Sequence, residues 1–180
     1  MGYAVELYFN PELETALRHL RQRLAEAGVS SALDGLGDRP HVSLAVLHDL
    51  GVEACSATLD QFARATPTFP VSLASVGVFP SSEGVLFLAP VMTDQLWGVH
   101  RDFHSRLAGI KARLSDLYLP NRWVAHSTLA IHVPAAQMGR AVEACLAHFK
   151  PLSGLLTEVG LIEFRPVKTL AAFKLDAETA

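Results

Sequence analysis

His41-Val-Ser-Leu-Ala-Val-Leu-His48 and His126-Ser-Thr-Leu-Ala-Ile-His-Val133 are two versions of one eight-residue pattern. Each version begins with a histidine, carries a hydroxyl residue two positions later, and continues into an apolar run that predicts a β-strand. Side chains two positions apart in a strand point to the same face, so we expect His41 beside Ser43 and His126 beside Thr128. Two imidazoles, each with a hydroxyl neighbour, predict an acid-base pair.

The elements expected around the two motifs follow the same order twice. The first set is a strand at 3–9, a helix at 11–28, the first His strand, a helix at 52–65 and a strand at 69–79. The second set is a strand at 85–91, a helix at 94–107, the second His strand at 126–133, a helix at 134–149 and a strand at 155–164, followed by an extra strand at 169–175. Equivalent positions lie 85 residues apart at His41 and His126, 83 apart at Gly77 and Gly160, and 82 apart at Tyr3 and Val85.

This agreement predicts an internal duplication within a single bilobal domain, residues 1–180, with repeat halves at about 1–80 and 84–175. The fold class expected is α/β (α+β). Two pseudo-symmetric lobes would each contain a small, mainly antiparallel sheet with helices on its outer face. Equivalent residues would then face each other across a central groove between the sheets, which brings the two histidines together.

Composition limits the class of protein. The chain has 180 residues, of which 50% are hydrophobic and 18% are charged, so it is long enough to bury a substantial core. Its apolar runs are too short to span a bilayer and no signal-peptide pattern is present, so we expect a soluble, cytoplasmic monomer. Cys55 and Cys145 are expected to be reduced, structural thiols. The net charge of −3 argues against binding of long nucleic acid, so any phosphate ligand should be small or terminal.

The residue types in the motifs suit phosphate chemistry. Histidine titrates near neutrality, so one imidazole can remove a proton while the other donates one. The hydroxyls of Ser43 and Thr128 can donate to phosphate oxygens. In-line displacement at phosphorus needs such a base and acid on opposite sides, without an obligatory metal or cofactor.

Several further stretches accompany the motifs: Arg39-Pro40, the strand end Val76-Gly-Val-Phe-Pro80 and the next strand, Gly84-Val-Leu-Phe-Leu88. With them, the chain resembles the two-histidine phosphoesterase superfamily over nearly its whole length, specifically the bacterial 2′-5′ RNA ligase-like cyclic phosphodiesterases. The resemblance implies opening of 2′,3′-cyclic phosphates on RNA ends or small nucleotides, with His41 and His126 catalytic and Ser43 and Thr128 binding phosphate. The reverse reaction, joining RNA ends through a 2′-5′ bond, uses the same groups. The chain departs from the family pattern at Ser43, where Thr is commoner, and at Ala125, where Pro often precedes the histidine.

Two other functions stay open at this point. One is a noncatalytic module that binds nucleotides or RNA ends, and the other is a metal-dependent hydrolase that uses the additional histidines. His100 and His104 are four residues apart on a helix and could ligate zinc, although a helix-surface or packing role is favoured because the motif lacks the Glu of a metalloprotease.

Other residues near the motifs have a possible functional role and a structural alternative. His132 could line the groove or end a strand, and His48 is expected to be exposed. Phe79 and Phe164, at matching strand ends, could stack a base, but core packing is favoured. The arginines near the motif strands could steer phosphate or simply be solvated: Arg39, Arg122 and Arg165.

Overall fold

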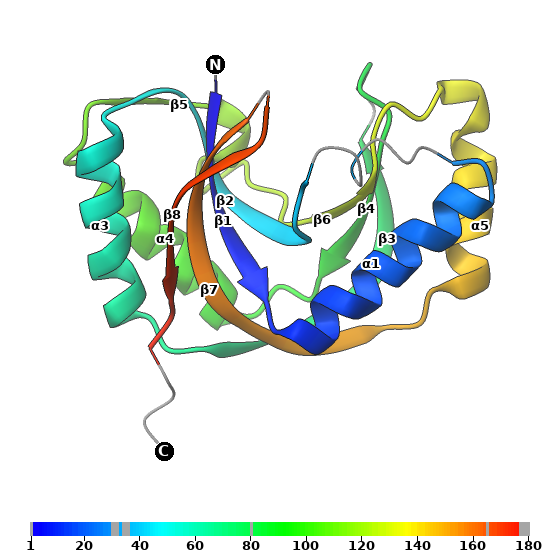
Figure 1. Ribbon diagram of the computed structural model, residues 1–180, viewed down its shortest axis with the longest axis horizontal. Helices are drawn as coiled ribbons and strands as arrows, with labels where there is room; N and C mark the ends of the chain where they lie inside the picture. Colours follow the sequence, from blue (N-terminus) through cyan, green and yellow to red (C-terminus); the bar gives the residue numbers. More distant parts are fainter. Residues whose placement is uncertain (1, 30–32, 34–36, 80, 165, 177–180) are drawn as a thin grey trace.

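Strands and helices lie close to where the sequence pattern predicts them. The structure is a computed structural model that describes residues 2–29, 33, 37–79, 81–164 and 166–176 (Figure 1). Its strands are β1 Gly2–Phe9, β2 His41–Leu50, β3 Phe69–Phe79, β4 Val85–Pro90, β5 Ala112–Leu114, β6 Ser127–Ala130, β7 Leu152–Phe164 and β8 Lys168–Lys174. Its helices are α1 Pro11–Glu26, α3 Val52–Ala65, α4 Asp94–Leu107 and α5 Met138–His148, with short 3-10 turns η1 Asp116–Tyr118 and η2 Ala135–Gln137.

The second His strand is shorter than predicted. β6 covers only Ser127–Ala130, so His126 directly precedes the strand and His132 follows it. His132 adopts a left-handed φ of 60°, which ends the extended conformation. The predicted helix at 134–149 correspondingly begins as the 3-10 turn η2 and becomes α-helical only at Met138. The three-residue strand β5 was not predicted, because it is too short to show an alternating pattern.

All of these strands belong to one antiparallel sheet. The order is β5-β2-β1-β7-β3-β4-β6, and β8 also pairs with β7. β7 connects the two parts of the sheet, because its start pairs with β3 and its remainder pairs with β1. We call β5, β2, β1, β8 and the C-terminal part of β7 the first lobe, and β3, β4, β6 and the N-terminal part of β7 the second lobe. The expected fold class, two lobes of antiparallel sheet and helices, is confirmed.

The pairing of β3 with β7 reveals the symmetry between the lobes. Val71 pairs with Gly154, and these positions are 83 residues apart, the same offset that separates the repeated Val-Gly segments. On either side, Phe69 pairs with Leu156 and Leu73 with Leu152, as a twofold axis through the central pair requires. The lobes therefore exchange strands: β3 comes from the first half of the sequence but pairs with β4 of the second half, and β7 does the reverse.

The helices cover each lobe on its outer side. α3 and α4 pack together against the first lobe, while α1 and α5 pack together against the second (Figure 1). The leucines expected on one side of α1 are buried, and Phe62 of α3 meets Phe103 of α4 edge to face at 5.2 Å. Cys55 and Cys145 are buried free thiols, as predicted.

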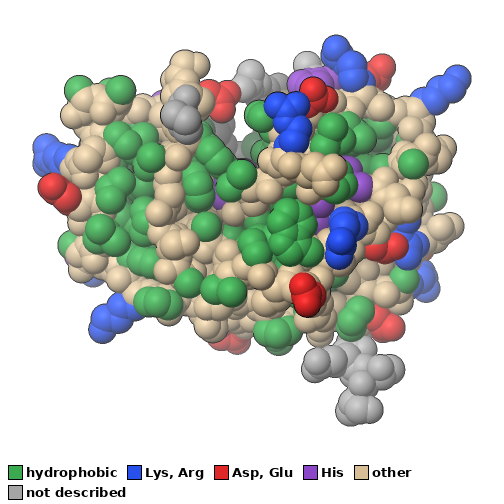
Figure 2. Space-filling model, turned by 180° about the vertical axis from the view of Figure 1, so that it is seen from behind, with side chains coloured by type: hydrophobic (Ala, Val, Ile, Leu, Met, Phe, Trp, Pro, Cys, Tyr) green, Lys and Arg blue, Asp and Glu red, His purple; other side chains and the backbone are tan. Residues whose placement is uncertain are grey.

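The surface carries no broad patch of one charge on the face seen in Figure 2. Lys and Arg side chains are scattered there and alternate with Asp and Glu. In the described part of the chain, no helix combines the length and apolar character needed to cross a membrane.

The two histidines of α4 have a packing role. His100 is fully buried, stacks on Trp123 at 3.8 Å between ring centroids and donates its Nε2 hydrogen to the carbonyl oxygen of Tyr118. His104 donates in the same way to the carbonyl of Leu44 in β2. Burial, with a smaller effect of His104, lowers the pKa of His100 to about 4. The packing interpretation is confirmed, because both Nε2 atoms are occupied by backbone carbonyls.

We predict that acid destabilises the protein through His100. The folded state keeps this imidazole neutral, whereas the unfolded chain takes up a proton near the ordinary histidine pKa of 6.5, so stability is lost as the pH falls from 6.5 toward 4. The loss in unfolding free energy from this one group should be on the order of 2 to 3 kcal/mol. Chemical denaturation at several pH values measures it.

The matched variants are His100→Gln, which keeps a donor for the Tyr118 carbonyl but cannot titrate, and His48→Gln, which changes an exposed histidine. His100→Gln should flatten the pH dependence and His48→Gln should leave it unchanged. Equal pH slopes in the wild type and in His100→Gln would contradict the prediction.

Candidate active site

The two motif histidines have the same backbone setting. His41 begins β2 and His126 directly precedes β6. The Nδ1 atom of each ring donates to the carbonyl two residues earlier, at 2.7 Å: that of Arg39 for His41 and that of Val124 for His126. Each ring is thereby held in one orientation, with Nε2 as the nitrogen left for chemistry.

The surroundings of His126 are aromatic. Its ring lies 4.8 Å from Phe79 and 5.4 Å from Phe87, measured between centroids, and 6.5 Å from Tyr118. Burial lowers the pKa of His126, and a charge on His41 lowers it further. The two imidazoles are therefore close enough to influence each other, and the setting of His126 favours its neutral form.

The surroundings of His41 are acidic. Its Nε2 lies 3.4 Å from Oε1 of Glu6, and its Nδ1 lies 3.5 Å from Oδ1 of Asp38. Glu6 is 3% exposed, and Tyr8 donates its hydroxyl hydrogen to Oε2 of Glu6 at 2.9 Å. Burial raises the pKa of Glu6, while the charge of His41 acts in the opposite direction.

Glu6, Asp38 and His41 also form the one group of metal-ligand types, within the described ranges, whose donor atoms lie within 4.8 Å of one another. Each already has a protein partner: Tyr8 for Glu6, Arg21 for Asp38 and the Arg39 carbonyl for His41. These contacts satisfy the three side chains without an ion, so we do not assign them as ligands. The metal-dependent alternative nevertheless has its best location here, not at His100 and His104.

The two hydroxyl residues lie on the inner sides of their lobes, each at a cavity. Thr128 lines a cavity of about 430 Å³ next to His126, together with Phe79, Tyr118 and Arg122. Ser43 lines a cavity of about 240 Å³ together with Glu6, Asp38 and Phe164. Thr128 therefore lines the same cavity as His126, whereas Ser43 lines a cavity with Glu6 and Asp38, the two carboxylates beside His41.

Tyr118 links the two cavities. It lines the cavity beside His126, and its side chain is close enough to Ser43 for that residue to lower its pKa. Burial raises the pKa of Tyr118 to about 12, with contributions from Glu6 and Glu83, so its hydroxyl stays protonated and available as a donor.

Two buried side chains tie each motif to the opposite lobe. Arg21 of α1 donates through Nε and Nη2 to the carbonyl of Thr128 at 3.1 and 2.8 Å, and it also binds the carbonyl and the carboxylate of Asp38. Trp123, three residues before His126, donates its indole hydrogen to the carbonyl of Ser43 at 3.0 Å. Asp38 is likewise three residues before His41, so the two ties are reciprocal.

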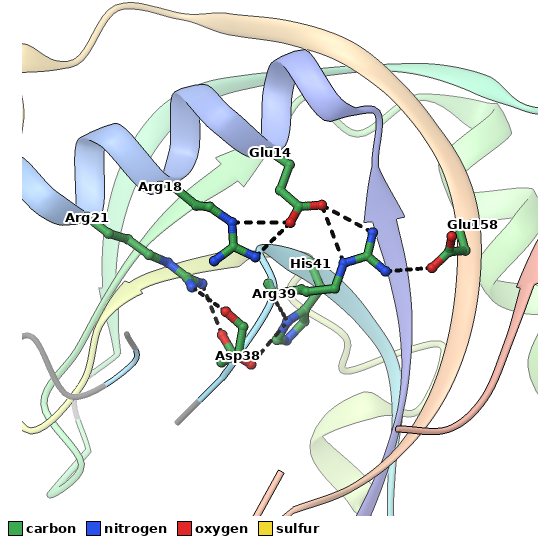
Figure 3. Close-up of polar contacts among 7 residues, drawn as sticks. All are labelled: Glu14, Arg18, Arg21, Asp38, Arg39, His41 and Glu158. Carbon is green, nitrogen blue, oxygen red and sulfur yellow. Dashed lines mark hydrogen bonds and ion pairs between the residues drawn. The ribbon is translucent and has the colours of Figure 1, made fainter. Parts of the chain in front are cut away.

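Arg39 does not offer a free charge to phosphate. Figure 3 shows its guanidinium between Glu14 and Glu158, with contacts of 3.1 and 2.6 Å, and it lies 4.1 Å above the centre of the Tyr8 ring. It lines a cavity of about 660 Å³, which neither motif histidine lines. Of the other arginines proposed for phosphate, Arg122 is exposed and lines the cavity beside His126, and Arg165 lies outside the described residues.

The remaining predicted residues fall into two groups. Phe79 and Phe164 are half-buried; Phe79 stacks on Phe87 at 4.4 Å, and each lines the cavity of its own lobe. They therefore combine packing with exposure to the cavities. His48 and His132 are exposed, as predicted for His48.

Sequence reasoning missed Glu6 and Tyr118. The signal for Glu6 was one acidic residue inside the apolar strand Tyr-Ala-Val-Glu-Leu-Tyr-Phe, where an unexplained charge points to a function. Tyr118 lies in a segment without periodicity, so its position had no comparable signal.

Comparison with known proteins agrees with this geometry. A sequence model described as the 2′-5′ RNA ligase superfamily matches residues 36–167. No curated protein matches the chain.

Solved structures with the same fold match almost the whole chain. TT0787 of Thermus thermophilus is 20% identical, with a TM-score of 0.66 and coverage of 99% of this chain and 100% of that one. E. coli LigT in its apo form is 20% identical, with a TM-score of 0.64 and coverage of 97% of this chain and 96% of that one. E. coli LigT complexed with 3′-AMP is 20% identical, with a TM-score of 0.61 and coverage of 96% of each chain. Since the family match covers both histidine motifs and well over half of the sequence, this chain belongs to the 2′-5′ RNA ligase superfamily, among the two-histidine phosphoesterases.

Proposed function

We propose that the protein is a metal-independent cyclic phosphodiesterase that opens 2′,3′-cyclic phosphates on RNA ends or small nucleotides. The observation that carries the proposal is the pair of equivalent imidazoles, each fixed through Nδ1 so that Nε2 is the nitrogen available for proton transfer. Membership in a phosphoesterase superfamily supports the reaction class. The complex of LigT with 3′-AMP supports a small nucleotide as the ligand of this fold.

In the proposed reaction, His126 is the base and His41 is the acid. His126 takes a proton from water through Nε2, and the water oxygen bonds to phosphorus. The bond from phosphorus to one ribose oxygen breaks as His41 donates its Nε2 proton to that oxygen. Ser43 and Thr128 donate hydrogen bonds to the phosphate oxygens, where negative charge accumulates in the transition state.

The assignment of roles follows from the two environments. Aromatic rings and burial favour the neutral form of His126, which a base needs. Two carboxylates lie beside His41, 3.4 Å from Nε2 and 3.5 Å from Nδ1, and can accept hydrogen bonds from a ring that carries the proton an acid donates. If a 5′-hydroxyl replaces water as the nucleophile, its oxygen bonds to phosphorus, the bond from phosphorus to the ribose 3′-oxygen breaks, and a 2′-5′ bond forms with the same groups.

We predict that His41→Ala and His126→Ala each lower kcat/KM for a 2′,3′-cyclic nucleotide by roughly 100-fold or more, the usual contribution of a positioned acid or base. Steady-state hydrolysis of 2′,3′-cyclic CMP measures the effect. His48→Ala and His132→Ala, which remove exposed histidines of the same two segments, are the matched controls and should retain activity. Wild-type turnover by either folded motif variant would disprove the mechanism, and binding without turnover in the wild type would support the noncatalytic alternative.

A second prediction concerns the hydroxyls. Ser43→Ala and Thr128→Ala should each cost about 1 to 3 kcal/mol of transition-state stabilisation, or roughly 5- to 150-fold in kcat/KM. Ser127→Ala, which removes a fully buried hydroxyl adjacent to Thr128, is the control and should have little effect on kinetics. Unchanged kinetics in both Ser43→Ala and Thr128→Ala would assign these hydroxyls a structural role.

A third prediction concerns how activity depends on pH and on metal ions. The base, His126, must be neutral to accept a proton. Because its pKa is lowered from the ordinary value of 6.5, the acid limb of the kcat/KM profile should lie below pH 6.5. The two limbs belong to the coupled pair of imidazoles.

Activity should persist in EDTA. Loss of activity in EDTA with recovery on zinc or manganese would instead make Glu6, Asp38 and His41 a metal site.

A further inference from the structure

The two lobes place different residues beside their equivalent histidines. In the first lobe, Ser43 of β2 pairs with Glu6 of β1. In the second lobe, Thr128 of β6 pairs with Phe87 of β4. Since Ser43 and Thr128 are equivalent positions, Glu6 and Phe87 occupy the same place in the two lobes.

The exchange of Glu6 for Phe87 gives Nε2 of the two histidines different electrostatic surroundings. The carboxylate of Glu6 is 3.4 Å from Nε2 of His41, so an acidic oxygen lies beside the nitrogen that would carry the transferred proton. The ring of Phe87 lies 5.4 Å from the ring of His126, and it offers no charge and excludes water. The same backbone geometry therefore presents one histidine to a carboxylate and the other to hydrocarbon.

The structure holds the Glu6 carboxylate in place from behind. Tyr8, two residues along β1, donates to Oε2, and the Arg39 guanidinium covers the Tyr8 ring. Glu14 and Glu158 hold Arg39 in turn. Oε1 is thus the oxygen that faces His41.

Other titratable and charged groups around His41 do not take the place of Glu6. Asp38 faces Nδ1, but its charge is compensated by the buried Arg21 of α1. Tyr8 and Tyr118 are kept neutral by burial, and the charge of His41 lowers the pKa of His126. Among the described residues, His41 is the one ion-pair partner of Glu6.

We propose that Glu6 is a positioning residue that keeps the reaction's proton on Nε2 of His41, and that Glu6 in one lobe and Phe87 in the other divide two equivalent histidines into donor and acceptor. The proposal rests on the proposed function for its role in catalysis. Its electrostatic part concerns the free protein and is testable without turnover.

The experiment is a pH titration of the histidine ring signals by NMR in protein labelled with ¹⁵N-histidine. In Glu6→Gln, the titration midpoint of His41 should move to a pH about one to three lower than in the wild type. The midpoint of His126 should not move down with it. In the same variant, the basic limb of the kcat/KM profile should move to lower pH, so that activity above the limb falls about tenfold when the limb moves by one on the pH scale.

Two further variants make the result decisive. Glu163→Gln removes a partly exposed carboxylate from the neighbouring strand β7 and should leave both midpoints unchanged. The double variant Glu6→Leu with Tyr8→Phe replaces both hydrogen-bonding partners by apolar groups, which a buried site tolerates well, and it should reproduce the His41 shift if Glu6→Gln fails to fold.

An unchanged His41 midpoint in the folded Glu6 variants, or an equal downward shift of both histidines, would overturn the proposal. A wild type without cyclic phosphodiesterase activity would refute the proposed function but not the electrostatic inference, because the NMR titration needs no substrate. A loss of activity at all pH values, without movement of the His41 midpoint, would assign Glu6 a structural role and would also overturn it.

Discussion

The buried guanidinium of Arg21 fixes the relation between the two histidine motifs. It is 2% exposed, and a charged group at such a depth is tolerated only when its donors are satisfied. Its donors go to the carbonyl of Thr128 in one lobe and to the backbone and carboxylate of Asp38, just before His41, in the other. The tie from Trp123 to the carbonyl of Ser43 does the same from the opposite side. A shift of either motif would leave a buried donor without its partner, so the spacing between the imidazoles is built into the core.

The path of β7 adds a covalent constraint. This strand is 13 residues long, and it pairs with β3 of the second lobe before it pairs with β1 of the first. The lobes are therefore not separate bodies joined by a linker, since they share a continuous strand. Their exchange of β3 and β7 also means that neither half of the sequence contains a complete lobe.

Local patterns in the sequence were sufficient to predict most elements and the two motifs, because period-two alternation and the leucine stripe of α1 are properties of adjacent residues. They could not predict strand exchange, since alternation marks a strand but does not name its partner. Arg21 was hidden for a similar reason. It adjoins Leu20 within an amphipathic helix, where a basic residue normally faces solvent, and only the tertiary structure shows that it is buried against Thr128 and Asp38. The significance of Glu6 likewise depends on register, because its neighbour Ser43 is 37 residues away in the chain.

A pseudo-symmetric fold creates a difficulty for acid-base catalysis that has to be overcome by its side chains. Repetition of the backbone gives two histidines with the same Nδ1 hydrogen bond and a hydroxyl residue two positions later, so the backbone alone does not distinguish them. Displacement at phosphorus requires them to differ, because one must accept while the other donates. The backbone positions that hold the rings must therefore stay alike in the two halves, while the side chains around Nε2 must diverge. A carboxylate facing one ring and phenyl groups facing the other meet this requirement without disturbing the strands that carry them.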